Sequence, residues 1–356
     1  MVGGNEEVMS GKRVLGVAIQ GAGNVATEHI RAYQRNPRTE VVAIGSRREE
    51  GARAKAAEMG LECAIYTDYE ALLAHPGVDI VSICTPHDRH AIETIAAARA
   101  GKHILIEKPV AINRQDLREM AEAVRTAGVK TVVSFVLRWN PLVITLKELL
   151  GRGALGPVFY AEVDYLHGTW HRRRPMPLSY EPPKDRPART PISTFLGGGC
   201  HAVDMARYLM GSEIVEVTAL APTDEGKDRP ARTTIALVRF ANGGVGKVAG
   251  SSRQKMPYVF NIELYGEGGS VRNNRVYSDL FPGQTDFVEI PTVMPDSGDV
   301  AHHPFQEEID HLVECIRRDE ESHCSLADAV NTHEACFAAD RSAAEGGVPV
   351  RLPLEE

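Results

Sequence analysis

The sequence predicts an α/β protein with a doubly wound parallel sheet at its start and an open, mostly antiparallel sheet after it. Two observations support this fold class. Continuous apolar runs alternate with helical periodicities over roughly the first third of the chain, a pattern typical of parallel strands buried on both faces. Later segments alternate apolar with polar residues and are joined by Asn-Gly and Gly-Gly turns, as antiparallel hairpins are. A chain of 356 residues has room for two cores, and we place the domains at 1–138 and 139–356.

The first domain is predicted to repeat a strand and helix unit. Its apolar runs cover 13–20, 40–46, 78–85 and 102–108, and helical patterns lie between them at 25–36, 48–60 and 90–102. Because crossovers between parallel strands are right-handed, this order builds a sheet with helices on both faces. In the second domain we expect helices at 141–150, 201–211, 303–318 and 326–345, and strands within 158–170, 213–222, 232–252 and 258–277.

Charge and composition argue against a nucleic-acid or membrane partner. The formal net charge is −8 with acidic and basic residues mixed along the chain, whereas binding to a phosphate backbone needs a basic stripe. No apolar run reaches membrane-spanning length, and residues 1–12 lack the apolar core of a signal peptide. The six cysteines show no CxxC spacing, which is typical of reduced thiols. We therefore expect a cytoplasmic protein.

One group of cysteines and histidines near the carboxyl end could suggest zinc. Its members are Cys315, His323, Cys324, His333 and Cys336. Their spacings fit no common zinc finger, and the two helices expected there account for them as core or surface residues. We predict no metal site.

The segment GAGNVA (21–26) directly follows the first predicted strand and opens the first helix. Gly21 allows the tight turn, Gly23 lets the backbone approach a pyrophosphate, and Ala26 is small where the helix meets the strand. The helix terminus at Asn24 and Val25 would then face the anion. In this setting the pattern predicts a dinucleotide site.

The end of the second predicted strand bears on which dinucleotide is bound. A carboxylate at this point would grip the ribose hydroxyls, yet the strand ends in Ser46, Arg47 and Arg48, and Glu40 lies at its other end. A hydroxyl and guanidinium groups suit a 2′-phosphate, so we expect NADP(H), with NAD(H) as the alternative. The arginines would otherwise be solvated residues at the start of a helix.

Two further motifs end neighbouring strands, at the edge where open α/β sheets bind ligands. They are CTPHDRH (84–90) and IEKP (106–109). The proline after Lys108 ends the strand and would hold the lysine near the nicotinamide. Burial and the cationic ring would lower the pKa of Lys108, so that it exchanges a proton near neutrality; a surface lysine before a turn is the alternative. The candidate cofactor contacts are Gly21, Gly23, Asn24, Val25, Ser46, Arg47, Arg48, Thr85, Pro86, His87, His90, Glu107, Lys108 and Pro109.

A glycine run followed by a helical pattern, GGGCHAVDMARYLMG (197–211), supplies the next candidates. Glycines let the backbone come close to a ligand, and the imidazole of His201 can exchange a proton at physiological pH. A core histidine is the alternative. Asp204 either orients His201 or is simply a carboxylate that the helix dipole stabilises. Tyr165, His167, Trp170 and His171, together with Arg138 of RWNP, are candidate substrate contacts, although an aromatic strand face packed on helices would explain the first four equally well.

In this order and at these intervals, GAGNVA, CTPHDRH, EKP, RWNP and the glycine-histidine-aspartate run resemble the glucose-fructose oxidoreductase, inositol dehydrogenase and rhizopine catabolism (Gfo/Idh/MocA) family over about residues 13–290. The resemblance implies a Rossmann domain joined to an α/β domain with an open, largely antiparallel sheet. It also implies association through that sheet, which predicts a homodimer or homotetramer. Residue by residue, it makes Lys108 the catalytic lysine and His201 the histidine that contacts the reacting hydroxyl. The family's aspartate four residues before this histidine is here Gly197, which leaves a Lys108 and His201 dyad.

The expected activity is hydride transfer between NAD(P) and a secondary alcohol of a sugar, cyclitol or related polyol. One member of the dyad would accept the hydroxyl proton while the other polarises the carbonyl oxygen, without a metal. Two alternatives stay open. A lyase or glycosidase with a tightly bound, recycled cofactor would use the same dyad, and a non-catalytic dinucleotide-binding sensor would keep only the fold.

Overall fold

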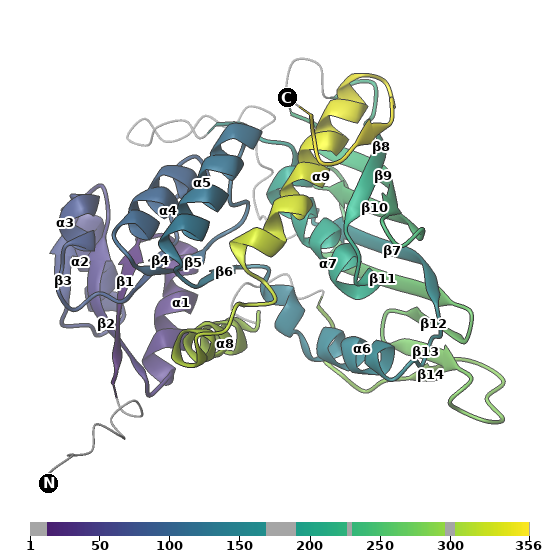
Figure 1. Cartoon of the computed structure of the whole chain (residues 1–356), viewed down its shortest axis with the longest axis horizontal. Helices are drawn as coiled ribbons and strands as arrows, with labels where there is room; N and C mark the ends of the chain where they lie inside the picture. The colour runs from purple at the N-terminus through teal and green to yellow at the C-terminus, as the bar shows by residue number, and fades with distance from the viewer. Residues whose placement is uncertain (1–12, 169–189, 226–229, 296–302, 356) are drawn as a thin grey trace, which may run out of the picture.

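The computed structural model describes residues 13–168, 190–225, 230–295 and 303–355. It contains a six-stranded and a nine-stranded sheet, which confirms the predicted fold class (Figure 1). Among the described residues, no helix combines the length and the apolar character needed to cross a bilayer.

The first sheet is parallel throughout. Its strands are β1 (Leu15–Gln20), β2 (Thr39–Gly45), β3 (Ala64–Tyr66), β4 (Ile80–Ile83), β5 (His103–Ile106) and β6 (Thr131–Val133). The connecting helices are α1 (Asn24–Arg35), α2 (Glu49–Glu58), α3 (Tyr69–Leu73), α4 (His90–Arg99) and α5 (Arg114–Ala127). The spatial order β3-β2-β1-β4-β5-β6 is that of a doubly wound sheet. Strands β3 and β6 and helix α3 were not predicted because three to five residues are too few to show a period. Helix α5 was also not predicted, although its buried Leu117 and Met120 are three residues apart, as on a helix face.

The second sheet is mixed. Its strands are β7 (Val158–Leu166), β8 (Ile214–Leu220), β9 (Thr233–Phe240), β10 (Val245–Ser251), β11 (Val259–Gly266), β12 (Gly269–Arg272), β13 (Arg275–Ser278), β14 (Val288–Glu289) and β15 (Val350–Arg351). They lie in the order β14-β13-β12-β11-β7-β10-β9-β8-β15. Every pair is antiparallel except β7 with β10.

Helices cover one face of this second sheet (Figure 1). They are α7 (Cys200–Met210) and α9 (Leu326–Ala344). Strand β9 shows the division, because Ala236 and Val238 are buried beneath the helices whereas Ile235 and Leu237 are exposed on the opposite face. The alternation is what a sheet with one covered face requires.

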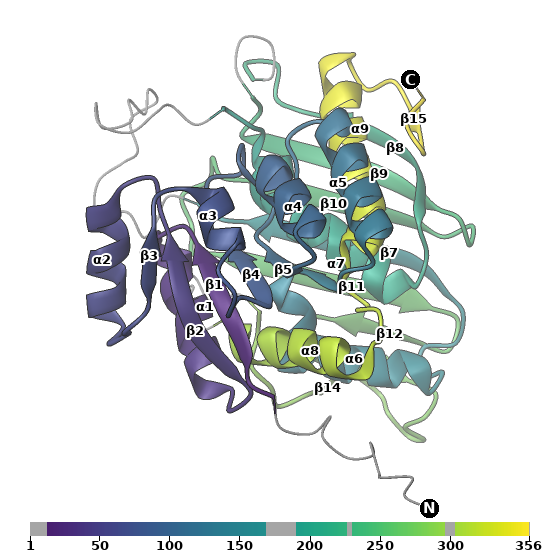
Figure 2. The same ribbon diagram turned by 60° about the vertical axis from the view of Figure 1, so that its left-hand side comes forward.

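Three elements join the two sheets. They are the 3₁₀ turn η1 (Val136–Trp139) and the helices α6 (Pro141–Gly151) and α8 (Phe305–Arg318). Helix α8 follows the second sheet in the chain but packs beside α1 of the first (Figure 2), where the Asn36 amide donates to Asp310 at 2.7 Å. Helix α9 contacts both α5 and β8. The carboxyl edge of the parallel sheet is therefore held close to the helix-covered face of the second sheet.

Candidate active site

A cavity of about 680 Å³ lies at the carboxyl edge of the parallel sheet, where open α/β folds bind ligands. It unites the glycine turn after β1, the end of β2 and the turn that opens α4. The residues that line it are Gln20, Gly21, Ala22, Gly23, Ser46, Arg47, Arg48, Gly51, Tyr66, Thr67, Asp68, Tyr69, Cys84, Thr85, Pro86, Asp88, Arg89 and Glu93. Of the candidate cofactor contacts, this lining includes Gly21, Gly23, Ser46, Arg47, Arg48, Thr85 and Pro86, but not Asn24, Val25, His87, His90, Glu107, Lys108 or Pro109.

The amino terminus of α1 opens onto this cavity. Gly23 is the N-cap and has no side chain to bond to the first amides, and the first turn carries no acidic residue. A Cβ on Gly23 would meet nothing within 4 Å, so the approach is open. Gly21 has a φ of +109°, and a Cβ there would lie 2.7 Å from the Cys84 carbonyl oxygen, so the turn requires glycine. Free amides at a positive helix end form a site for a pyrophosphate.

Some residues that line this cavity were not predicted from the sequence as cofactor contacts. Gln20 and Tyr66 end strands β1 and β3, so the rule that ligands bind at carboxyl ends could have found them. Glu93 lies inside α4, where no sequence signal marks it. Its carboxylate is 1% exposed, accepts from the Gln20 amide at 2.9 Å and also accepts from the Thr85 hydroxyl. This buried carboxylate therefore fixes polar side chains that come from two neighbouring strands.

Lys108 follows β5 at the same edge of the sheet. Its Nζ donates to the carbonyl oxygen of Gly197 at 3.5 Å, so the side chain reaches the second domain. Burial lowers the pKa of Lys108, but the Tyr165 phenol, the Cys200 thiol and the Glu107 carboxylate raise it by more, to a value above its usual one. The predicted lowering by burial is therefore outweighed by neighbouring groups, which the strand pattern does not reveal. The side chain is an ammonium at neutral pH.

His201 lies in the first turn of α7 and is 5% exposed. Burial, followed by the charges of Lys108 and His303, lowers the pKa of His201 well below its usual range, so the ring is neutral at physiological pH. Its Nδ1 is buried and has no hydrogen-bond partner among the described residues. The ring stacks on Tyr165 with centroids 6.0 Å apart and meets Phe135 edge-on at 5.8 Å. Lys108, Tyr165 and His201 thus form one group.

The glycine run before His201 forms a π-helical turn, η3 (Phe195–Gly199). A Cβ on Gly198 would lie only 2.4 Å from Cε1 of Tyr165, so this glycine makes room for the aromatic ring. At Gly197 a Cβ would meet only the flexible end of Ile192, at 3.3 Å. The glycines therefore accommodate Tyr165 as well as the approach of Lys108 to the backbone.

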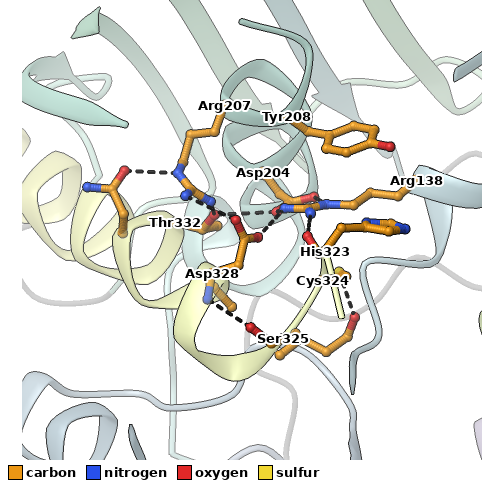
Figure 3. A network of polar contacts seen from close by, with 12 residues as sticks. Arg138, Asp204, Arg207, Tyr208, His323, Cys324, Ser325, Asp328 and Thr332 are labelled. Atoms are coloured by element: carbon orange, nitrogen blue, oxygen red, sulfur yellow. Dashed lines mark hydrogen bonds and ion pairs between the residues drawn. The ribbon is translucent and has the colours of Figure 1, made fainter. Parts of the chain in front are cut away.

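Asp204 and Arg138 lie in a buried ion-pair network (Figure 3). The Arg138 guanidinium donates to both carboxylate oxygens of Asp204, at 2.8 and 2.5 Å, and to Asp328 at 2.6 Å. Burial lowers the pKa of Arg138, but Asp204 and Asp328 raise it by more. Thr332 also donates to Asp204, at 3.4 Å. Both candidates are therefore engaged with each other, 66 residues apart in the chain, and not with His201.

The remaining candidates divide among several locations. His90 is 1% exposed, with both ring nitrogens 2.8 Å from backbone carbonyl oxygens, so it contacts the protein and not the cavity. His87 Nε2 lies 2.9 Å from the Thr190 carbonyl oxygen. His167 lies beside Tyr165, with centroids 5.9 Å apart. Trp170 and His171 fall outside the described residues. Within the described part of the chain, no three His, Cys, Asp or Glu side chains are arranged to hold a metal ion.

Both halves of the chain match models of known protein families. Residues 15–135 match the family model described as "Oxidoreductase family, NAD-binding Rossmann fold", and residues 143–272 match the "GFO/IDH/MocA C-terminal domain". The chain is 30% identical over 259 residues to myo-inositol 2-dehydrogenase of Thermotoga maritima, covering 72% of this chain and 74% of that protein.

Two further comparisons give one similarity in sequence and one in fold. Levoglucosan dehydrogenase of Pseudarthrobacter phenanthrenivorans is 30% identical over 230 residues, covering 58% of this chain and 57% of that protein. A solved structure of levoglucosan dehydrogenase in complex with NADH and L-sorbose superposes with a TM-score of 0.82 at 24% identity, over 97% of this chain and 100% of that one. The chain therefore belongs to the Gfo/Idh/MocA family of oxidoreductases with an NAD-binding Rossmann fold.

Proposed function

We propose that the protein transfers a hydride between a nicotinamide dinucleotide and a secondary alcohol of a sugar, cyclitol or related polyol. The observation that carries the proposal is the meeting of Lys108, from the dinucleotide-binding sheet, with Tyr165 and His201 from the second domain. Relatives named as inositol and levoglucosan dehydrogenases support the substrate class. Neither the lyase or glycosidase alternative nor the sensor alternative gains support from these relatives.

The charge states of the group suggest a division of labour. When bound, the dinucleotide supplies the hydride acceptor or donor. The Lys108 ammonium would stabilise negative charge that develops on the substrate oxygen. The neutral imidazole of His201 would accept the hydroxyl proton during oxidation and return it during reduction. The Tyr165 hydroxyl, on the ring that stacks against His201, would bind a further substrate oxygen.

The cofactor is proposed to be NADP(H) in preference to NAD(H). Support comes from Ser46, Arg47 and Arg48, which line the same cavity as the glycine turn and follow β2 directly. A guanidinium group at this position matches a 2′-phosphate in charge and geometry. Asp68, which follows β3, also lines the cavity, but one of its carboxylate oxygens already accepts a hydrogen bond from the Ala71 amide at 3.1 Å.

A homodimer or homotetramer through the second sheet is also proposed. On the face away from the helices, Leu220, Ile235, Leu237 and Val245 are between 41% and 61% exposed on strands β8, β9 and β10. Neighbouring apolar side chains exposed on one face of a sheet are typical of a subunit contact. Light scattering after size exclusion would test this, with Leu237→Glu expected to give a smaller particle.

The test of the activity is a screen of purified protein against sugars, cyclitols and sugar acids with NAD⁺ and NADP⁺, following absorbance of the reduced cofactor. Lys108→Ala and His201→Ala should bind dinucleotide yet lose roughly 10² to 10⁴ in turnover, as expected for a proton-transfer or charge-stabilising group. Lys102→Ala is the matched control, because Lys102 precedes β5 and donates to the Val78 carbonyl at 2.9 Å. Normal turnover by either active-site variant would refute the assignment of that residue.

A further inference from the structure

Three buried histidines surround the segment that carries Lys108. They are His29, His90 and His333, and each is at most 1% exposed. They come from α1, α4 and α9, three helices far apart in the chain. Nothing in the proposed chemistry uses them, although burying an imidazole is unfavourable unless its nitrogens find partners. One ring nitrogen of each contacts the segment Glu107–Val110.

The three contacts cover both sides of Lys108. His29 Nε2 lies 3.2 Å from the Glu107 carboxylate, whose other oxygen accepts from the Lys108 backbone amide at 3.2 Å. His90 Nδ1 lies 2.8 Å from the Pro109 carbonyl oxygen. The Val110 amide donates to His333 Nε2 at 3.0 Å. Side chains thus pair with three backbone groups at this strand end, the Lys108 amide, the Pro109 carbonyl and the Val110 amide.

The protonation states agree with these contacts. His333 Nδ1 lies 2.9 Å from the Ala329 carbonyl oxygen and donates to it, which leaves Nε2 as an acceptor for Val110. Burial lowers the pKa of His333 to about 4, so the acceptor persists at neutral pH. At His29, burial lowers the pKa, but Cys84 and Glu107 raise it by more, so the ring can donate to the Glu107 carboxylate.

We propose that His29, His90 and His333 are positioning residues that fix the backbone of Glu107–Val110 and thereby aim the Lys108 ammonium at the reacting oxygen. This inference rests on the proposed function of Lys108. Helix α1 opens onto the pyrophosphate site, the turn before α4 lines the dinucleotide cavity, and α9 covers the second sheet. The three histidines therefore set the lysine relative to the cofactor site and to the second domain at once.

His333 gives the sharpest test, because it lies on α9 and does not line the cavity; it meets the Phe135 ring, which in turn meets His201. His333→Leu removes the acceptor for the Val110 amide, whereas His333→Gln keeps an oxygen near the position of Nε2. His103→Leu is the matched control. His103 lies at the opposite end of β5, and its Nδ1 also accepts a hydrogen bond from a backbone amide, that of Lys130, at 3.0 Å.

We expect His333→Leu to lower kcat about 10- to 100-fold, because small displacements of a catalytic group have effects of that size. KM and the Kd for NAD(P)H should stay within about twofold, since ground-state binding is unaffected. His333→Gln should recover kcat to within about threefold, and His103→Leu should leave it unchanged even where it lowers Tm. Equal kcat in His333→Leu and the unmodified protein, or equal losses in the Leu and Gln variants, would overturn the proposal.

A second readout needs no substrate. Competitive labelling with acetic anhydride, quantified by peptide mass spectrometry, reports the reactivity of Lys108 relative to Lys102. The ratio of Lys108 to Lys102 labelling should change in His333→Leu and stay constant in His333→Gln and His103→Leu. An unchanged ratio in all three variants would refute the positioning of Lys108 by His333, even if no polyol is turned over. If the unmodified protein oxidises no polyol, the proposed function fails separately. Should His333→Leu not fold, the pair His90→Leu and His90→Asn applies the same comparison, because Asn keeps a donor for Pro109.

Discussion

Replacing Asp204 distinguishes a structural carboxylate from one that orients His201. In Asp204→Ala the Arg138 guanidinium, 1% exposed, loses the partner that accepts two of its hydrogen bonds, at 2.8 and 2.5 Å. Removing one member of a buried ion pair costs about 3 to 5 kcal/mol. Because Asp328 still contacts Arg138 at 2.6 Å, we expect the lower end, about 3 kcal/mol.

The assay is urea unfolding followed by circular dichroism. Asp328→Ala is the matched control, because its carboxylate meets the same guanidinium but is 31% exposed; it should cost about 1 kcal/mol. The double variant Arg138→Met with Asp204→Leu should recover most of the loss, since apolar groups replace a buried pair at little cost. It should also retain turnover to within about tenfold, because neither side chain touches His201.

The reasoning would be refuted by the opposite pattern. If Asp204→Ala unfolds at the urea concentration of the unmodified protein and yet loses about 100-fold or more in turnover, the carboxylate acts on the chemistry. Persistence of that kinetic loss in the double variant would support the same conclusion, because stability would have been restored without activity.

Three further outcomes are expected. Arg47→Ala should abolish most of the preference for NADPH over NADH, measured by fluorescence titration, while the affinity for NADH is retained. Equal affinities of the unmodified protein for NADPH and NADH would contradict selectivity for NADP(H). Gly198→Ala should lower Tm and turnover, because its Cβ would lie 2.4 Å from the Tyr165 ring, whereas Gly197→Ala should be tolerated; similar effects of both would exclude this clash. Burial raises the pKa of Glu308 from 4.5 to about 8, so between these pH values the folded protein holds a proton on Glu308 that the unfolded protein has lost. The protonated carboxyl therefore contributes fully to stability below the unfolded pKa, and this contribution is lost as pH rises through 8. Glu308→Gln should therefore remove part of the fall in urea midpoint between pH 6 and pH 8.5, and identical slopes would show that Glu308 is ionised.

The amino-acid sequence by itself determined four of the six parallel strands with the helices α1, α2 and α4 between them, the glycine turn and the location of Lys108 at a strand end. Each of these depends on residues that are close in the chain. Apolar runs bounded by turn residues define buried strands, and a glycine whose φ is positive, such as Gly21, marks the turn before a helix. The carboxyl ends of parallel strands then meet at one edge of the sheet, so the sequence alone predicts a dinucleotide site at that edge.

Tertiary structure alone decided what surrounds the reactive groups. Arg138 lies 66 residues from Asp204 in the chain, and His333 lies 223 residues from Val110, whose amide donates to it. No local sequence pattern therefore connects the members of either pair. The pKa of Lys108 depends on Glu107, Tyr165 and Cys200, of which only Glu107 is adjacent in the chain. Desolvation and Coulomb energies fall off with distance in space and not with separation in sequence. The charge of the lysine, the neutrality of the histidine and the structural use of Asp204 therefore became visible only once the two sheets were packed together.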